Sequence, residues 1–229
     1  MYKIIYDEMH NGGNIKNIKY LSSLVQSKQN IFMLACHTGK FDLIKWLWEK
    51  FHNEIDITYC ENYVFRYLCG NGYLDIAKWL WEVSLEETTN SRKEIDREMK
   101  RINIHDHDED AFRWACTEGH LDVVKWLWEI SQKEIPINIH IHDDDTFVQV
   151  CYNGHIDVAK WMWEISCKMS SPINIHTPNE RVFRLACIGN QRDIAIWLLK
   201  ISNYSTNSTV FDCLPKNVKE WLKKLDKKK

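Results

Sequence analysis

The fold is decided by a stretch that occurs twice in close succession, Phe112-Arg-Trp-Ala-Cys-Thr-Glu-Gly-His-Leu-Asp-Val-Val-Lys-Trp-Leu-Trp-Glu-Ile130 and Phe147-Val-Gln-Val-Cys-Tyr-Asn-Gly-His-Ile-Asp-Val-Ala-Lys-Trp-Met-Trp-Glu-Ile165. In both copies a phenylalanine stands fourteen residues before a tryptophan. The same pair of anchors recurs at Phe32/Trp46, Phe65/Trp79 and Phe183/Trp197. Successive anchor phenylalanines are 33, 47, 35 and 36 residues apart, which indicates a repeat of short two-helix units.

Each copy predicts two helices joined by a tight turn. Phenylalanine and cysteine lie four residues apart, on one face of the first helix. A glycine at a fixed position, or Asn190 in the last unit, supplies the left-handed residue that ends this helix. An aspartate three residues later is placed in the first turn of the second helix, where its charge meets the positive end of the helix dipole.

The same pattern divides the chain. Residues 1–205 are predicted to form six repeats, at about 1–27, 28–58, 59–103, 104–138, 139–174 and 175–205. Tyr6 and Tyr20 are interpreted as the aromatic anchors of an atypical first copy, since they are also fourteen residues apart. The charged run within residues 84–100 is an insertion, expected to be an extended helix end or a mobile loop, and residues 206–229 are expected to form a capping unit with a basic tail.

A helix, the motif Ala-Cys-x-x-Gly-His, a second helix and Ile-Asn-Ile-His follow one another in an order that resembles the ankyrin repeat. The resemblance covers nearly the whole chain and implies an all-α solenoid of stacked helix-turn-helix units with short hairpin-like loops. The interval from Asn103 to Phe112 is nine residues, where the ankyrin pattern has ten and a glycine. Together, Trp-Leu-Trp-Glu and Ile-Asn-Ile-His are similar to the divergent ankyrin families of giant amoeba-infecting DNA viruses.

Composition narrows the possible functions. The chain of 229 residues is 45% apolar and 27% charged, as in an ordinary globular protein. Its formal net charge of −2 provides no general basic field for nucleic acid or anionic lipid. No stretch is apolar for long enough to span a membrane or to form a signal-peptide core, so we expect an intracellular monomer, in the host cytoplasm if the protein is viral. Five of the eight cysteines occupy one repeat position, which favours small buried residues over disulfides.

Enzymatic and metal-binding functions fit the repeat poorly. His105, His140 and His176 occupy equivalent positions, but successive repeats place such residues roughly 8 to 10 Å apart, too far for one zinc ion. A ladder of identical residues likewise offers no unique constellation for acid-base or nucleophilic chemistry. We therefore expect no enzyme activity, no metal and no cofactor.

The tryptophans form two columns, because Trp126 and Trp128 point to nearly opposite sides of one helix. Both columns are interpreted as structural, filling the seams between units. The alternative is that the column of Trp48, Trp81, Trp128 and Trp163 forms a partly exposed, adhesive stripe.

By resemblance, the concave face of the solenoid binds a partner protein, and neither nucleic acid nor membrane is expected as a partner. The candidate contacts are exposed positions that vary between repeats: Tyr67, Asp106, His107, Asp108, Trp114, Glu118, His142, Asp143, Asp144, Tyr152, Thr177 and Asn179. The acidic residues among them predict a partner with a basic patch, unless they only form turns and helix starts. Two other functions remain open: a structural or packaging component without a specific partner, and a ubiquitin-ligase substrate adaptor, since Cys213-Leu-Pro resembles the start of an F-box.

Overall fold

The computed structural model describes residues 2–10, 15–90, 101–176, 180–202 and 218–221. The chain divides into two compact units, Met1–Phe112 and Arg113–Lys229, and each unit is described by itself.

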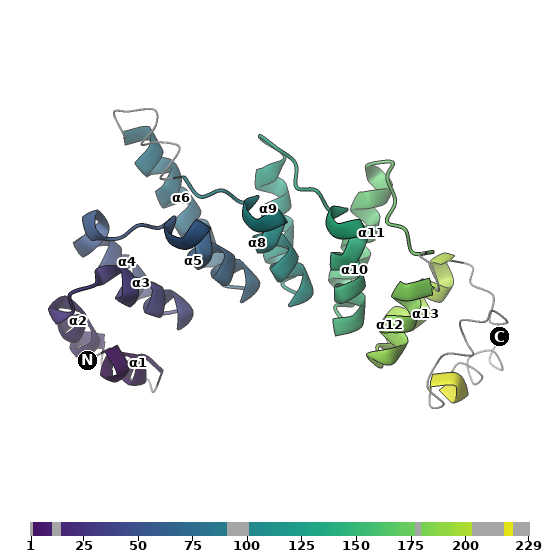
Figure 1. Cartoon of the computed structure of the whole chain (residues 1–229), viewed down its shortest axis with the longest axis horizontal. Helices are drawn as coiled ribbons and strands as arrows, with labels where there is room; N and C mark the ends of the chain where they lie inside the picture. The colour runs from purple at the N-terminus through teal and green to yellow at the C-terminus, as the bar shows by residue number, and fades with distance from the viewer. Residues whose placement is uncertain (1, 11–14, 91–100, 177–179, 203–217, 222–229) are drawn as a thin grey trace. The chain divides into compact units, whose positions relative to one another are not determined.

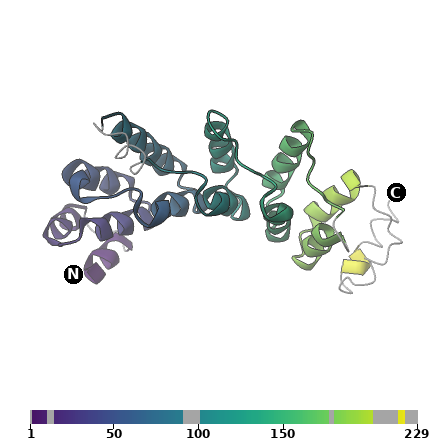
Figure 2. The same cartoon turned by 45° about the horizontal axis from the view of Figure 1, so that its top comes forward.

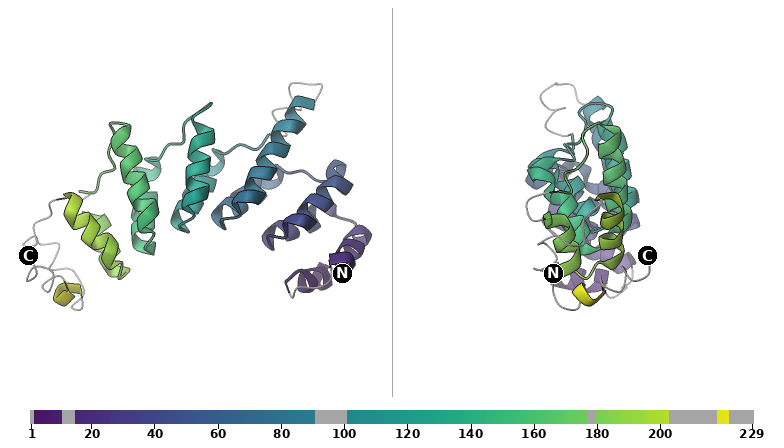
Figure 3. Two further views of the ribbon diagram at one scale, coloured as in Figure 1. Left: turned by 180° about the vertical axis from the view of Figure 1, so that it is seen from behind. Right: turned by 90° about the vertical axis from the view of Figure 1, so that its right-hand side faces the viewer.

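The first unit is built from pairs of antiparallel helices. The first helices of the pairs, α1, α3 and α5, form one layer in Figure 1. The second helices, α2, α4 and α6, are nearest to the viewer in the left view of Figure 3, where the molecule is seen from behind. Its elements are α1 (Tyr2–His10), α2 (Ile15–Leu24), α3 (Lys28–His37), α4 (Phe41–Phe51), the 3-10 turn η1 (His52–Glu54), α5 (Tyr59–Gly70), α6 (Leu74–Asn90) and the start of α8 (Asp106–Thr117).

The second unit repeats this arrangement. It contains the end of α8, then α9 (Leu121–Ser131), α10 (Ile141–Asn153), α11 (Ile156–Lys168), α12 (Arg181–Ile188) and α13 (Arg192–Ser202). Extended connections lead from the second helix of one pair to the first helix of the next (Figure 2). The described ranges contain helices and no strand, so the all-α prediction is confirmed. Residues 84–90 of the insertion continue α6 as an extended helix end, and its remainder lies outside the described residues.

The anchor phenylalanines are the centre of each helix pair. All five are buried, with at most 1% of their surface exposed. In most of these repeats an alanine and a cysteine three and four residues later are buried on the same face of the first helix. The first helices therefore pack through one apolar stripe, as the sequence predicted.

The turn between paired helices requires two properties of its glycine. Gly119 has φ +83°, and a side chain there would bring Cβ to 2.7 Å from Cε1 of His155 in the following repeat. A Cβ at Gly39, which also has a positive φ, would likewise come too close to the Tyr73 ring. Asn190 has φ +59°, as predicted, but its side chain is exposed. Asparagine is thus found where the left-handed conformation is needed without the close approach.

The tryptophan columns pack between helices. All eleven tryptophans are half-buried and none is among the exposed apolar side chains. Trp48 lies against Phe32 of its own first helix, with ring centroids 6.3 Å apart, and its edge meets Trp79 of the next repeat at 6.5 Å. Trp128 and Trp161 make the same T-shaped contact at 6.0 Å. These contacts support the structural interpretation of the columns, while each tryptophan keeps part of its surface exposed.

The connections between repeats are held by buried isoleucines and a buried serine. Both isoleucines of each Ile-Asn-Ile-His motif are buried, and the intervening asparagine accepts the histidine N–H through Oδ1, for example Asn138 from His140 at 3.0 Å. Ser131 is 1% exposed; its Oγ donates to the Trp128 carbonyl at 2.7 Å and accepts the Ile137 N–H at 3.3 Å. Ser166 makes the equivalent bonds to Trp163 and Ile173. The serine therefore fixes the path on which the isoleucines enter the core.

The predicted hairpin-like loops are replaced by left-handed turns. Three consecutive residues have φ between +51° and +63° at each of three equivalent places: Cys60 to Asn62, His107 to Glu109, and His142 to Asp144. Asparagine, aspartate and histidine tolerate this conformation best among residues with a side chain, and they are frequent here. The connection has one residue fewer than the ankyrin pattern, because it enters the first helix through this turn and forms no strand pair.

The interpretation of Tyr6 and Tyr20 as aromatic anchors is wrong. They are 43% and 65% exposed, whereas Ile5 and Met9 of α1 are fully buried. The apolar stripe of α1 is thus shifted by one residue from the tyrosine spacing. A match of two aromatic residues could not reveal this shift, because neighbouring positions of a helix point about 100° apart.

Replacing Gly119 by alanine is expected to lower the free energy of unfolding by about 1 to 3 kcal/mol, because the new Cβ meets both the left-handed backbone and the His155 ring. Urea denaturation followed by tryptophan fluorescence measures the loss. Asn190→Ala is the control. This variant bears only the cost of the left-handed backbone, so its free energy of unfolding should fall less. Adding His155→Ala to Gly119→Ala should restore part of the stability; equal losses in all variants would contradict the contact.

Replacing Ser131 by alanine is expected to destabilise the protein by about 1 to 2 kcal/mol, because the buried Ile137 N–H loses its acceptor. Ser23→Ala is the matched control. Its hydroxyl also donates to a carbonyl three residues back, that of Tyr20 at 2.6 Å, but it is exposed. A loss at Ser131 no larger than that at Ser23 would show that the serine does not fix the connection.

Candidate interaction surface

The exposed sides of the first helices and the left-handed turns provide the surface on which the sequence placed its candidate contacts. We call the segments 58–62, 105–109 and 140–144 the tips. Each tip contains the left-handed residues at the N-terminal end of α5, α8 or α10. The ends of the first helices, before the turn glycines, form the other edge of this surface.

The tips of the first unit are joined by polar contacts. Asp106 accepts from the side-chain amides of Asn62 and Asn103, and His107 Nε2 pairs with the Glu61 carboxylate. Arg66 of α5 reaches Asp110 of α8 at 2.6 Å in a partly buried salt bridge. Asp106 therefore serves the fold, while His107 and Asp108 are exposed.

The tip of the second unit has one acidic residue in its interior. Asp144, expected at the exposed surface, is 8% exposed, and this expectation is wrong. Its carboxylate contacts His140 Nδ1 at 2.7 Å and accepts the Asn174 N–H at 3.1 Å, which offsets its desolvation. His142 and Asp143 are exposed.

The histidine of each Ile-Asn-Ile-His motif contacts an acidic residue four positions later. The Nδ1 atoms of His105, His140 and His176 lie 2.9, 2.7 and 3.6 Å from carboxylate oxygens of Glu109, Asp144 and Glu180. From the sequence, these histidines were considered as metal ligands, and the pairs were not predicted. The spacing of four residues between each histidine and its acid could have predicted these contacts, but the segment was expected to form a hairpin.

The remaining candidates lie at the first-helix ends. Tyr67 and Trp114 are half-buried, Glu118 is exposed, and Tyr152 is 41% exposed. Tyr67 stacks on His37, with ring centroids 4.3 Å apart, and does not belong to the tips. Thr177 and Asn179 lie outside the described residues. The sequence missed Tyr63, which shares the surface of Tyr67 and of His37, a position also considered as a contact from the sequence.

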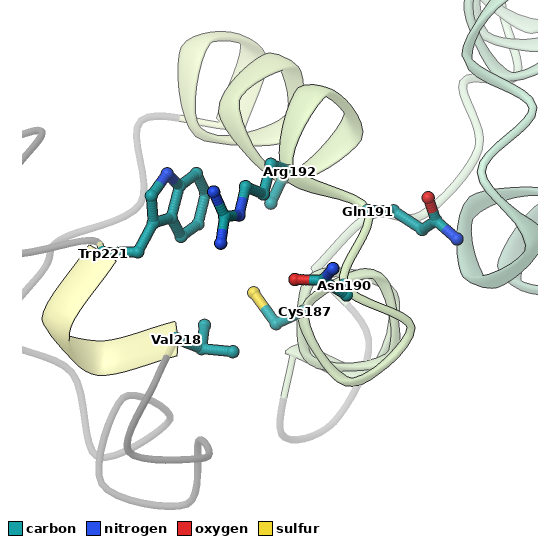
Figure 4. A pocket seen from close by; sticks show the side chains of 7 residues that line it. Cys187, Asn190, Gln191, Arg192, Val218 and Trp221 are labelled. Atoms are coloured by element: carbon teal, nitrogen blue, oxygen red, sulfur yellow. The ribbon is translucent and has the colours of Figure 1, made fainter.

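A small pocket lies beside the turn between α12 and α13 (Figure 4). Val218 and Trp221 approach it from the short C-terminal helical segment, and the Arg192 guanidinium lies 5.8 Å from the Trp221 ring centroid. The lining also includes Cys187 and Asn190. Here residues 218–221 cover the turn of the last pair, the place that a following repeat would take.

The described side chains offer little for catalysis or metal binding. No group of three or more potential metal ligands lies together in the described ranges. Burial raises the pKa of the repeat-position thiols at Cys36, Cys69, Cys116 and Cys151, and that of Cys187 to about 12. These thiols are therefore protonated at neutral pH and are poor nucleophiles.

Cysteine labelling is expected to separate two classes of thiol. At pH 7.5, iodoacetamide should modify the exposed Cys60 and Cys167 at least about ten times faster than the buried repeat-position cysteines. Mass spectrometry of the digested protein reads each site, and labelling in urea provides the unfolded control. Equal rates at Cys60 and Cys116 in the folded protein would contradict the buried, protonated state of the repeat cysteines.

The comparisons with known proteins agree with this architecture. A family model described as ankyrin repeats (3 copies) matches residues 32–143, from the anchor Phe32 onwards. No curated protein matches the chain. In the described ranges, no helix combines the length and apolar character that crossing a bilayer requires. Residues 32–143 are thus similar to ankyrin repeats, and the described helices are consistent with an all-α ankyrin-repeat solenoid, a kind of module that generally binds other proteins.

Proposed function

We propose that the protein is an interaction module that binds a partner protein through its first helices and tips. The observation that carries this proposal is the contrast between buried and exposed positions of the same helices. Five positions after the anchor, four of the five anchored repeats carry an exposed or half-buried residue, which is His37, Thr117, Tyr152 or Ile188. Gly70 at the remaining position is buried, and the stripe beside these positions is nearly constant. A scaffold with variable side chains on one face is suited to recognition.

The charge of the tips favours a partner with a basic patch. The middle residue of each left-handed turn is acidic and exposed: Glu61, Asp108 and Asp143. Asp106, Asp144 and Asp145 bond to neighbouring groups, and they account for the alternative that tip acids only stabilise turns. The three middle residues are exposed, although Glu61 also pairs with His107, and their acidic charge supports the hypothesis of a partner with a basic surface.

The more specific functions go beyond these observations. A host protein as the partner and a role as a ubiquitin-ligase adaptor rest on sequence resemblance, and the F-box-like segment after Cys213 lies outside the described residues. A structural component without a specific partner is the competing function. The two are separated by whether defined surface changes alter what the protein binds.

The double variant Asp108→Asn/Asp143→Asn tests the proposal. Asparagine keeps the left-handed conformation and removes two charges, so the fold should be retained while a basic partner binds several-fold more weakly. Affinity capture from a proteome, quantified by mass spectrometry at two salt concentrations, reads the change.

The matched control is Glu129→Gln/Glu164→Gln, which removes two exposed charges from second helices. Proteins captured by wild type and by this control, but depleted with the tip variant, support the proposal. Identical capture by all three forms would overturn the acidic contact, and no reproducible capture by any of them would favour a structural component.

A further inference from the structure

Aromatic rings gather on the first helices of the first unit. His37 of α3 lies between Tyr67 and Tyr63 of α5, with ring centroids 4.3 and 5.7 Å away, and the two tyrosine rings are 6.2 Å apart. We call these three residues the tyrosine cluster. The His37 ring is inclined by 48° to Tyr67 and by 82° to Tyr63, so the rings present faces in different directions.

Further tyrosines lie close to this cluster. Burial raises the pKa of Tyr67, and the neighbouring phenols of Tyr73, Tyr63 and Tyr6 raise it further. The Tyr67 hydroxyl is directed at the His37 carbonyl at 3.4 Å. The cluster is therefore held in place from the backbone of the neighbouring helix, and it remains half-buried rather than covered.

The first helices and tips of the unit that contains the cluster carry an excess of acidic residues. Residues 2–10, 28–37, 56–70 and 105–112, which make the first helices and tips of this unit, contain eight aspartates and glutamates but three lysines and arginines. Of these cations, Lys28 is buried against carbonyl oxygens and Arg66 pairs with Asp110. The second helices at 15–24, 41–51 and 74–90 are nearly balanced, with six acidic and five basic residues.

Aromatic faces in an acidic environment favour a cation. The quadrupole of a tyrosine ring attracts a positive charge to its face, and a planar guanidinium also stacks on it. Burial lowers the pKa of His37, so its ring is neutral at pH 7 and does not repel such a ligand. The chain itself contains this interaction, since Arg101 lies 5.6 Å from the Trp81 centroid and Lys45 4.0 Å from that of Phe41.

We propose that the tyrosine cluster binds an arginine side chain of the partner protein, with the guanidinium on the faces of Tyr63 and Tyr67 and the surrounding acidic residues attracting its charge. This inference rests on the proposed function, because it names the side chain that the same surface selects. Like the acidic tips, this second contact favours a positively charged group of the partner, but it is formed by aromatic rings.

The probe is the peptide acetyl-Gly-Arg-Gly-amide, titrated into the full chain and followed by aromatic proton-carbon NMR. The same peptide with citrulline is the matched ligand, since it keeps the shape and loses the charge. We expect saturable shifts at Tyr63 and Tyr67 with arginine, and binding about five-fold or more weaker with citrulline. Equal binding of both peptides, or shifts elsewhere only, would overturn the assignment.

Variants separate a binding role from a structural one. Tyr67→Ala should abolish the saturable shifts at Tyr63, whereas Tyr67→Phe keeps the ring and should restore binding to within about two-fold. Tyr20→Ala, at an exposed tyrosine of α2, should leave the titration unchanged. If Tyr67→Ala alters folding, the Phe variant decides: failure of Tyr67→Phe to bind the peptide overturns the role of the ring.

The two proposals fail in different ways. Absence of arginine binding, with partner capture by the full chain intact and still sensitive to Asp108 and Asp143, would overturn the arginine contact alone. Arginine-selective binding without any captured partner would support the contact chemistry and overturn the proposed function. A Pro-rich peptide that binds better than the arginine peptide would also overturn the arginine assignment, because aromatic surfaces recognise such peptides without charge.

Discussion

The structure depends on one constraint: a pair of short helices cannot bury its apolar faces by itself and must be covered by the next pair. The anchor phenylalanines fill the centre of each pair, and the tryptophans close the seams, as the edge contact of Trp128 with Trp161 shows. Close approach at the turns completes this packing, because Gly119 leaves room for His155 of the following repeat. The five repeats with a phenylalanine anchor therefore bury apolar side chains at the same positions.

The same constraint leaves one face free to vary. Buried positions are fixed by the neighbouring repeat, whereas exposed side chains of the first helices and tips are less constrained by packing. The left-handed turns add a requirement of their own, because three consecutive residues occupy a backbone region that is unfavourable for most side chains. Buried polar contacts, such as that of Asp144 with His140 and Asn174, hold these turns in place. Scaffold and surface therefore overlap at the tips, and only some of the acidic residues there are available to a partner.

Much of the fold follows from spacing in the sequence. The five anchor pairs, the turn glycines and Asn190 were all predicted, because helix packing repeats these side chains at fixed intervals. Tyr6 and Tyr20 were misjudged, since the atypical first pair buries Ile5 and Met9 instead. The candidate site was less predictable. Asp144 and Asp143 are neighbours in sequence and both acidic, but one is buried and the other exposed, and the difference depends on the left-handed turn.

By itself, the sequence determined which residues are buried in the helices, because amphipathic periodicity and glycine placement act within a few residues along the chain. It also determined that the chemistry is repeated rather than unique, which favours recognition over catalysis. Only the tertiary structure decided which surface residues lie together. His37, Tyr63 and Tyr67 belong to different repeats and meet because α3 and α5 are neighbours. The physical reason is that such contacts join positions about thirty residues apart, and their geometry is set by the packing of whole helices rather than by local conformational preference.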